Sequence, residues 1–484
     1  MFGPTITSGF DQIPGDMGDA RLVQYILNSN VTQSKQLHNI WNLPMYHPVE
    51  GILAYSDTYL LPTVIYALLG LVVNLSIAFP LWLMALAIGN YLSMYFVATR
   101  LLKAKVMWAI LASYMFAFPM IQAVQLGHPQ SLLRMFVPFG VYALYRFMQS
   151  RHIRYLIYFF AIFMLSMYCA VYIAYFLLLF GALALAIWTI YELVFVRDGS
   201  YFIDCTCTKK ELLLLTIAII GIAYIGYQYV RFAPSSGGNE LITMALAPKV
   251  TNYLGYPEGS IVANIAPILR AGHEDNSDVV VTMGIVYMGL LLATCVGALI
   301  KRQQGALILM SVVIVLYIVT TKYGSLFPWA TVSNLVPGAY IIRAVGRIWM
   351  MLHPVTIMVA IILFGRWKWS QILPLGLLII FIIENLVITI PSFSMRQSES
   401  NIEAVASQIP KNCDVAILTG ADYLVDGKIE SLYRNIDAMQ ASLRRNVKLI
   451  GGYTGYRPPY YPYVVDMATA KPLLRSGEKG CEVR

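Results

Sequence analysis

Long apolar stretches separated by short polar turns run through most of the chain. Stretches of about 20 apolar residues are long enough to cross a bilayer as α-helices. A shorter apolar segment, residues 59–72, is predicted to lie at the membrane interface or to re-enter it. The pattern predicts an all-α polytopic membrane protein with about ten transmembrane helices, near 75–98, 106–125, 133–148, 155–169, 172–195, 211–231, 281–300, 305–321, 346–365 and 370–391.

The turns between alternate spans are basic. If successive spans alternate in direction, all of these turns lie on one face, and the positive-inside rule makes that face cytoplasmic. Their basic residues are Arg100, Lys103, Lys105, Arg146, Arg151, Arg154, Arg197, Lys209, Lys210, Lys301, Arg302, Arg366 and Lys368. The long segments 1–74, 232–280, 322–345 and 392–484 then face outward. We therefore expect a multi-pass protein of the cytoplasmic (inner) membrane whose chemistry faces outward.

Composition agrees with this interpretation. The 484 residues are 58% hydrophobic and only 12% charged, whereas soluble domains are roughly 25% charged. The formal charge of +9 is accounted for by the basic turns, so nucleic acid is not an expected partner and membrane lipid is. The sequence has no phosphate-binding P-loop, dinucleotide fingerprint, H-E-x-x-H or G-x-S-x-G motif. ATP-driven transport and conventional hydrolysis therefore lack their usual signals.

The chain divides into three predicted parts. Residues 1–74 form an extracytoplasmic first loop, residues 75–391 the transmembrane domain, and residues 392–484 a small extracytoplasmic α/β domain. The first part requires export without a preceding span or signal peptide, so we expect a start further upstream with an additional helix. Translocation of the N-terminal tail by the first span is the alternative.

The tail has the periodicities of helices and buried strands. Residues 401–410 and 429–445 are predicted to be helical, and residues 413–420 form a buried strand. Residues 447–459 are predicted to be a strand that runs into a Gly/Pro-rich turn. Cys413 and Cys481 both lie in this exported tail, an oxidising environment, and are predicted to form a disulfide.

Aspartates gather in the first loop. Asp11, Asp16 and Asp19 lie within nine residues, and glycines between them allow an irregular backbone. Such carboxylates suit a general base, or coordination of a divalent cation beside a phosphate. The metal requirement stays open. A helical pattern begins after Asp19, so this aspartate could also serve only as a helix cap.

Other polar residues stand at the outer ends of the predicted spans. His128, Gln130 and Glu274 are candidates for substrate binding, because polar groups at that depth are costly unless they serve a site or are paired. Asp57 is a further candidate, because it stands among tyrosines of the first loop, and mixed aromatic and carboxylate surfaces are typical of carbohydrate sites. Three arginines on the same side, against the positive-inside trend, are candidates for binding a lipid phosphate. They are Arg134 and the pair Arg343 and Arg347, which a helix would place on one face.

The order of several short motifs resembles glycosyltransferase superfamily C. They are PGDMGDARLVQYIL, YSDTYL, LGHPQSLL, DAM at 437–439 and GGYTGYRPP. The resemblance covers nearly the whole chain and implies transfer of a sugar from a polyprenyl-phosphate donor to a glycan, lipid or protein acceptor. It also implies a catalytic role for Asp19 with Asp16 as its partner, although Asp19-Ala20 stands where the family commonly has Asp-Glu.

Two other functions remain open on the sequence alone. An envelope polysaccharide or lipid transporter, or a polymerase, would use the same outer polar residues but needs a continuous polar path, which the spans do not show. A non-catalytic scaffold of envelope assembly is compatible with the topology but leaves the density of outer charged residues unexplained.

Overall fold

The computed structural model describes residues 1–195, 203–232, 240–257, 259–270, 279, 281–367, 371–386, 390–420, 428–464 and 466–483. The chain is mostly helical (67%). Within the described residues, five helices are long and apolar enough to cross a membrane: Leu75–Leu101, Val106–Val124, Val171–Phe195, Lys209–Phe232 and Val345–Phe364. These helices indicate a multi-pass membrane protein.

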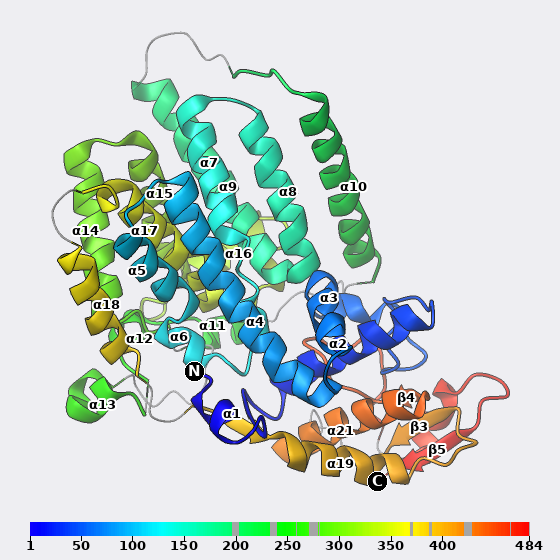
Figure 1. Cartoon of the computed structure of the whole chain (residues 1–484). Coiled ribbons are helices and arrows are strands. Elements are labelled where there is room, and N and C mark those ends of the chain that lie inside the picture. Colours follow the sequence, from blue (N-terminus) through cyan, green and yellow to red (C-terminus); the bar gives the residue numbers. More distant parts are fainter. Residues whose placement is uncertain are drawn as a thin grey trace.

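The helices form three groups along the chain (Figure 1). The first 74 residues contain α1 (Gly3–Thr7), α2 (Asp19–Lys35) and α3 (Leu60–Leu69). The central part contains α4 (Leu75–Phe96), α5 (Val106–Ala117), α6 (Met120–Val124), α7 (Val137–Ser150), α8 (Arg154–Cys169), α9 (Val171–Phe195), α10 (Lys209–Phe232), α11 (Glu240–Ala245), α12 (Val250–Leu254), α13 (Ile261–Ile265), α14 (Ile285–Lys301), α15 (Gln304–Thr320), α16 (Pro328–Leu335), α17 (Trp349–Phe364) and α18 (Ile372–Glu384). The tail contains α19 (Met395–Ser407), α21 (Ile429–Arg445) and α22 (Met467–Ala470).

The predicted spans 281–300 and 370–391 are shorter in the structure, where α14 has 17 residues and α18 has 13. Helices α8 and α15 agree with the predicted spans 155–169 and 305–321 to within a residue at each end. All four helices are shorter than a straight crossing of the hydrocarbon core needs. Proline and glycine explain two of the differences. Pro119 interrupts the predicted span 106–125, because the residue before a proline is disfavoured in the helical region. Gly284, with φ +77°, delays the start of α14 to Ile285.

Contacts among the basic turns place them at one end of the bundle. The Arg366 side chain donates to the carbonyl of Leu102 at 3.1 Å, and the Asp204 backbone N–H donates to the carbonyl of Arg151 at 3.0 Å. The first 74 residues and the tail lie together at the other end (Figure 1). This arrangement is the separation that the charge pattern predicts; Arg197 and Lys368 lie outside the described residues.

The tail folds around a small parallel sheet. Its strands β3 (Val415–Leu418), β4 (Lys448–Ile450) and β5 (Gly480–Val483) are ordered β4-β3-β5, and α21 connects β3 to β4. The predicted order of helix, strand, helix and strand is confirmed. The third strand, β5, is short and was not expected from the sequence.

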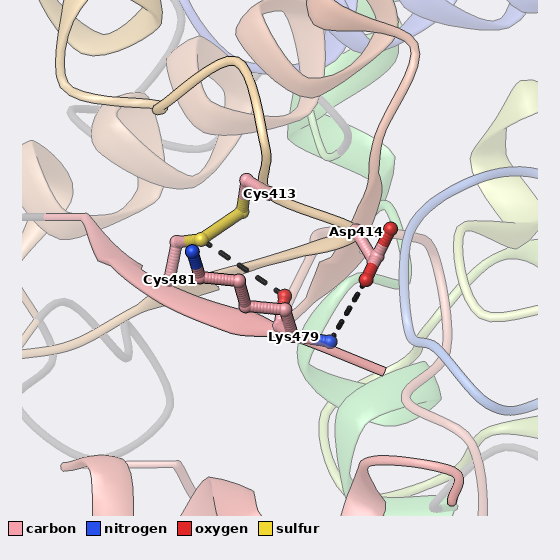
Figure 2. Close-up of a disulfide and its surroundings, with 4 residues drawn as sticks. All are labelled: Cys413, Asp414, Lys479 and Cys481. Atoms are coloured by element: carbon pink, nitrogen blue, oxygen red, sulfur yellow. Dashed lines mark hydrogen bonds between the residues drawn. A yellow bond between two sulfur atoms is a disulfide. The ribbon is translucent and has the colours of Figure 1, made fainter. Parts of the chain in front are cut away.

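The predicted disulfide is confirmed. Cys413, just before β3, is bonded to Cys481 in β5, with a Cα–Cα separation of 5.9 Å (Figure 2). Beside it the Lys479 backbone N–H donates to the Asp414 carboxylate at 2.9 Å. The disulfide and this hydrogen bond together tie the last strand to the centre of the sheet.

The first loop packs onto the tail. Strand β1 (Gln12–Pro14) pairs antiparallel with β2 (Ser392–Ser394), and a buried ion pair between Arg21 and Asp437 joins α2 to α21. The backbone N–H of His47 donates to the carbonyl of Leu449 at 2.9 Å. Segments from the two ends of the sequence therefore build one unit beneath the helix bundle, and the candidate site lies where they meet.

Candidate functional site

Asp19 is held from two sides by residues distant in sequence. Its Oδ1 accepts a 2.7 Å hydrogen bond from the Tyr453 hydroxyl, 434 residues away, and its Oδ2 lies 2.9 Å from Nδ1 of His128. Partial burial acts to raise the pKa of Asp19, but hydrogen bonds from His128 and Tyr453 and the charges of His128 and Arg347 lower it to about 2. The carboxylate is therefore ionised at physiological pH, and 31% of the side chain is exposed.

Asp16, not Asp19, binds the backbone N–H groups at the start of α2, whose N-cap residue is Gly18. Its Oδ1 accepts hydrogen bonds from the backbone N–H groups of Gly18 at 3.0 Å and Ala20 at 3.1 Å. Its other oxygen packs against Gly127, where a Cβ atom would lie only 2.6 Å away. Asp16 thus takes the capping role that the sequence also allowed for Asp19. The Asp19 side chain is left to face His128 and Tyr453.

Asp57 and Arg347 lie close to the Asp19–His128 pair. The Asp57 carboxylate accepts a 3.2 Å hydrogen bond from the Tyr172 backbone N–H at the start of α9. Burial raises the pKa of Asp57 to about 6, against the opposing hydrogen bond of Tyr172 and charge of Arg347. Arg347 lies 5.7 Å from the Tyr172 ring centroid. Its charge lowers the pKa of both Asp19 and Asp57, so it is placed to influence both carboxylates.

A cavity of about 240 Å³ opens beside Asp19. Arg343 and Asp19 line one part of it, and Tyr453 and Arg457 line the part formed by the tail. The Arg343 guanidinium lies 4.6 Å from the ring centroid of Tyr456. Among the described residues its side chain forms no ion pair or hydrogen bond. A cation without a carboxylate partner, at the wall of a cavity, favours an anionic ligand.

Arg343 and Arg347 do not share a helical face as predicted. Arg343 lies in a bend, and Arg347 lies in the short 3₁₀ helix Val345–Ile348 that precedes α17. The two side chains stack on different tyrosines, Tyr456 and Tyr172. The irregular backbone therefore spreads the two cations over the site instead of joining them into one clamp.

Arg134 is placed inside the helix bundle and not at the cavity. It is fully buried, between the rings of Phe116 and Trp349 at 4.9 and 4.8 Å. Its guanidinium donates to the Phe116 carbonyl and to Gln122 Oε1 at 3.0 and 3.1 Å. Since cation–π contacts and carbonyls stabilise this buried cation, its placement supports a packing role in place of the predicted phosphate contact.

Of the remaining predicted site residues, the structure describes Gln130 but not Glu274. Gln130 accepts a 3.4 Å hydrogen bond from the buried Tyr59 hydroxyl, two residues after Asp57. Glu274 lies outside the described residues. Within the described part of the chain, no three His, Cys, Asp or Glu side chains form a group that could hold a metal ion.

Tyr453 and Arg457 line the cavity but were not predicted as site residues from the sequence. Both belong to GGYTGYRPP, whose glycines and prolines predicted only a turn after a strand. Comparison with protein families and with curated proteins finds no match for this chain. The function must therefore be argued from the geometry of the site.

Proposed function

We propose that this protein transfers a sugar from a polyprenyl-phosphate donor to an acceptor on the outer face of the cytoplasmic membrane. The observation that carries the proposal is the ionised Asp19 carboxylate, held by His128 and Tyr453 beside a cavity that Arg343 also lines. Transfer from a lipid phosphate needs a carboxylate or base for the acceptor hydroxyl and cations for the departing phosphate. Both kinds of group meet here.

The reaction assigns a role to each group. The acceptor oxygen bonds to the anomeric carbon of the sugar, the bond from that carbon to the phosphate oxygen breaks, and polyprenyl phosphate leaves. The acceptor proton passes to the Asp19–His128 pair. Asp19, which lines the cavity, orients the acceptor hydroxyl and takes its proton, and His128 holds the carboxylate in place.

The two cations serve the donor. Arg343 and Arg347 approach Asp19 from the segment before α17, and both guanidinium groups are held on tyrosine rings. A guanidinium fixed by stacking keeps its planar N–H edge suited to phosphate oxygens. Negative charge develops on the phosphate as the glycosidic bond breaks, and the two arginines would stabilise that charge.

The substitution Asp19→Asn tests the proposal. Asparagine keeps the size and one acceptor oxygen but cannot take up the proton of the acceptor hydroxyl, so transfer should fall on the order of 100-fold or more. The assay incubates the purified protein with a panel of polyprenyl-phosphate sugars and oligosaccharides and follows free polyprenyl phosphate by mass spectrometry.

The matched control is Asp16→Asn. Asparagine caps a helix about as well as aspartate, so this variant should keep transfer within a few-fold of the unmodified protein. Equal rates for Asp19→Asn and the unmodified protein would overturn the assignment of Asp19. No release of polyprenyl phosphate by any protein in the series, from any donor, would overturn the proposed function.

A further inference from the structure

We propose that the cavity at the carboxyl ends of β3 and β4 is the acceptor subsite and that it binds a sugar carrying an anionic group. The name acceptor rests on the proposed function. The binding of an acidic sugar does not, because it follows from the shape and charge of the cavity itself.

The sheet topology places the cavity where parallel sheets bind ligands. Leu418 is the last residue of β3 and Gly451 directly follows β4, and both line the cavity. In open sheets of parallel strands, ligands bind in the crevice outside the carboxyl ends of the strands. Gly451 and Gly452 have φ values of +112° and +148°, which residues with a side chain rarely adopt. A Cβ on Gly452 would also lie 3.0 Å from Met45, so this position favours glycine.

Arg457 gives this part of the cavity a fixed positive charge. Its guanidinium lies 4.0 Å from the ring centroid of Tyr463 and 5.7 Å from that of Tyr461, and it donates to the carbonyl of Pro462. Prolines and stacked rings hold the arginine in place, which lowers the entropy lost when it binds a ligand. Among the described residues, the cavity lining has two arginines, Arg343 and Arg457, and one carboxylate, Asp19, so the balance of charge favours an anion.

The other lining residues suit a hydroxylated ring. The lining includes the tyrosines Tyr46, Tyr453 and Tyr461 and the polar residues Asn435 and Thr454, a mixture of aromatic and polar side chains that is typical of sugar sites. A ring bound here would lie beside Asp19, which lines the same cavity. A carboxylate or phosphate on that ring would form a charge-assisted hydrogen bond with Arg457. A uronic acid or a phosphorylated sugar has this combination of groups.

Binding to the full-length protein in detergent tests the inference without requiring catalysis. The probes are a disaccharide ending in a uronic acid, its neutral counterpart, a sugar phosphate and inorganic phosphate, each measured by calorimetry. We expect the acidic disaccharide or the sugar phosphate to bind about tenfold more tightly than the neutral disaccharide, as one charge-assisted contact provides. Whichever of these two probes binds more tightly shows whether the anionic group is a carboxylate or a phosphate.

The decisive variant is Arg457→Gln. It should remove the preference for the anionic sugar and leave binding of the neutral disaccharide unchanged. Arg475→Gln, an exposed arginine of the same domain outside the cavity lining, should keep the preference. Equal binding of acidic and neutral sugars by the unmodified protein, or a preference that survives Arg457→Gln, would overturn the inference. Inorganic phosphate binding as tightly as the acidic sugars would overturn the sugar part of it.

The two proposals fail separately. Selective binding of the acidic sugar with no transfer from any polyprenyl-phosphate donor supports the subsite and overturns the transferase. Transfer from such a donor without any preference for an acidic acceptor supports the transferase and overturns the subsite.

Discussion

Asp16 and Asp19 lie three residues apart and have different tasks. The Asp16 carboxylate is occupied by backbone N–H groups of its own helix terminus, whereas Asp19 contacts His128 and Tyr453. The sequence showed that aspartates gather in this loop. It could not show which one caps the helix, because both stand near the start of the helical pattern. The backbone before α2 decides it: Gly15, with φ +126°, packs against Leu126 and brings Asp16 onto Gly127.

The meeting of Asp19 with Tyr453 could not be predicted from one sequence. The two residues are 434 positions apart, and their contact depends on how the tail docks on the first loop. His128 and Arg347 were recognised because each is a polar residue at the outer end of an apolar span, and Asp57 because it stands among tyrosines of the first loop. Arg134 met the same criterion and is buried in the bundle. Sequence position gives depth along the membrane normal, but not the direction in which a side chain points.

Asp57 makes the stability of the protein depend on pH. Burial raises its pKa to about 6 from the usual 3.8, so the folded protein holds this proton more tightly than the unfolded chain. The contribution to stability is fully present below the unfolded pKa and is lost as pH rises through about 6. Asp57→Asn, which is neutral at every pH, should therefore raise the unfolding temperature more at about pH 7.5 than at about pH 5.

Thermal unfolding in detergent at the two pH values measures this effect. Glu403→Gln removes an exposed carboxylate of α19, 68% accessible, and is the control, with the same small effect at both values. An Asp57→Asn shift that is equal at the two pH values, or larger at the lower one, would contradict the raised pKa.

At the scale of elements, hydrophobic periodicity predicted the long helices well and their ends less well. The predicted span 172–195 agrees with α9 to within a residue, because nothing in it breaks a helix. Pro119 interrupts the predicted span 106–125, and Gly284 delays the start of α14. In the tail, β5 was missed because its four residues, Gly480–Val483, are too few for an alternation to be recognised. Its pairing with β3 is a long-range contact.

The disulfide should contribute strongly to the stability of the sheet. Cys413 and Cys481 are 68 residues apart in sequence, and closing a loop of that length restricts the unfolded chain. We expect Cys413→Ser to lower the free energy of unfolding of the tail by about 2–4 kcal/mol. Protease susceptibility of the tail in the full-length protein, followed over a urea series, measures the change.

A cysteine outside the disulfide provides the control. Cys295 lies in α14 and is not bonded to another cysteine, so Cys295→Ser should leave the tail as resistant as in the unmodified protein. Equal susceptibility of the tail in Cys413→Ser and Cys295→Ser would contradict the contribution of the disulfide.

At the scale of the whole molecule, the basic turns and the site lie at opposite ends of the bundle (Figure 1). The charge rule then predicts that the basic turns face the cytoplasm and that the first loop and the tail face outward. Reporter fusions at residues 205 and 430 should report opposite sides of the membrane, with residue 205 cytoplasmic. Fusions that place both residues on one side would contradict the topology, and with it the outward-facing site.

The proposed transferase must bind a polyprenyl phosphate between Asp19 and the arginines. Native mass spectrometry of the full-length protein with added polyprenyl phosphate measures this binding. The unmodified protein and Arg475→Gln should carry the lipid as a bound adduct. The double variant Arg343→Gln with Arg347→Gln should bind it at least about tenfold more weakly, because it lacks both guanidinium groups that would contact the phosphate. No adduct on the unmodified protein, or equal binding by the double variant, would contradict the claim.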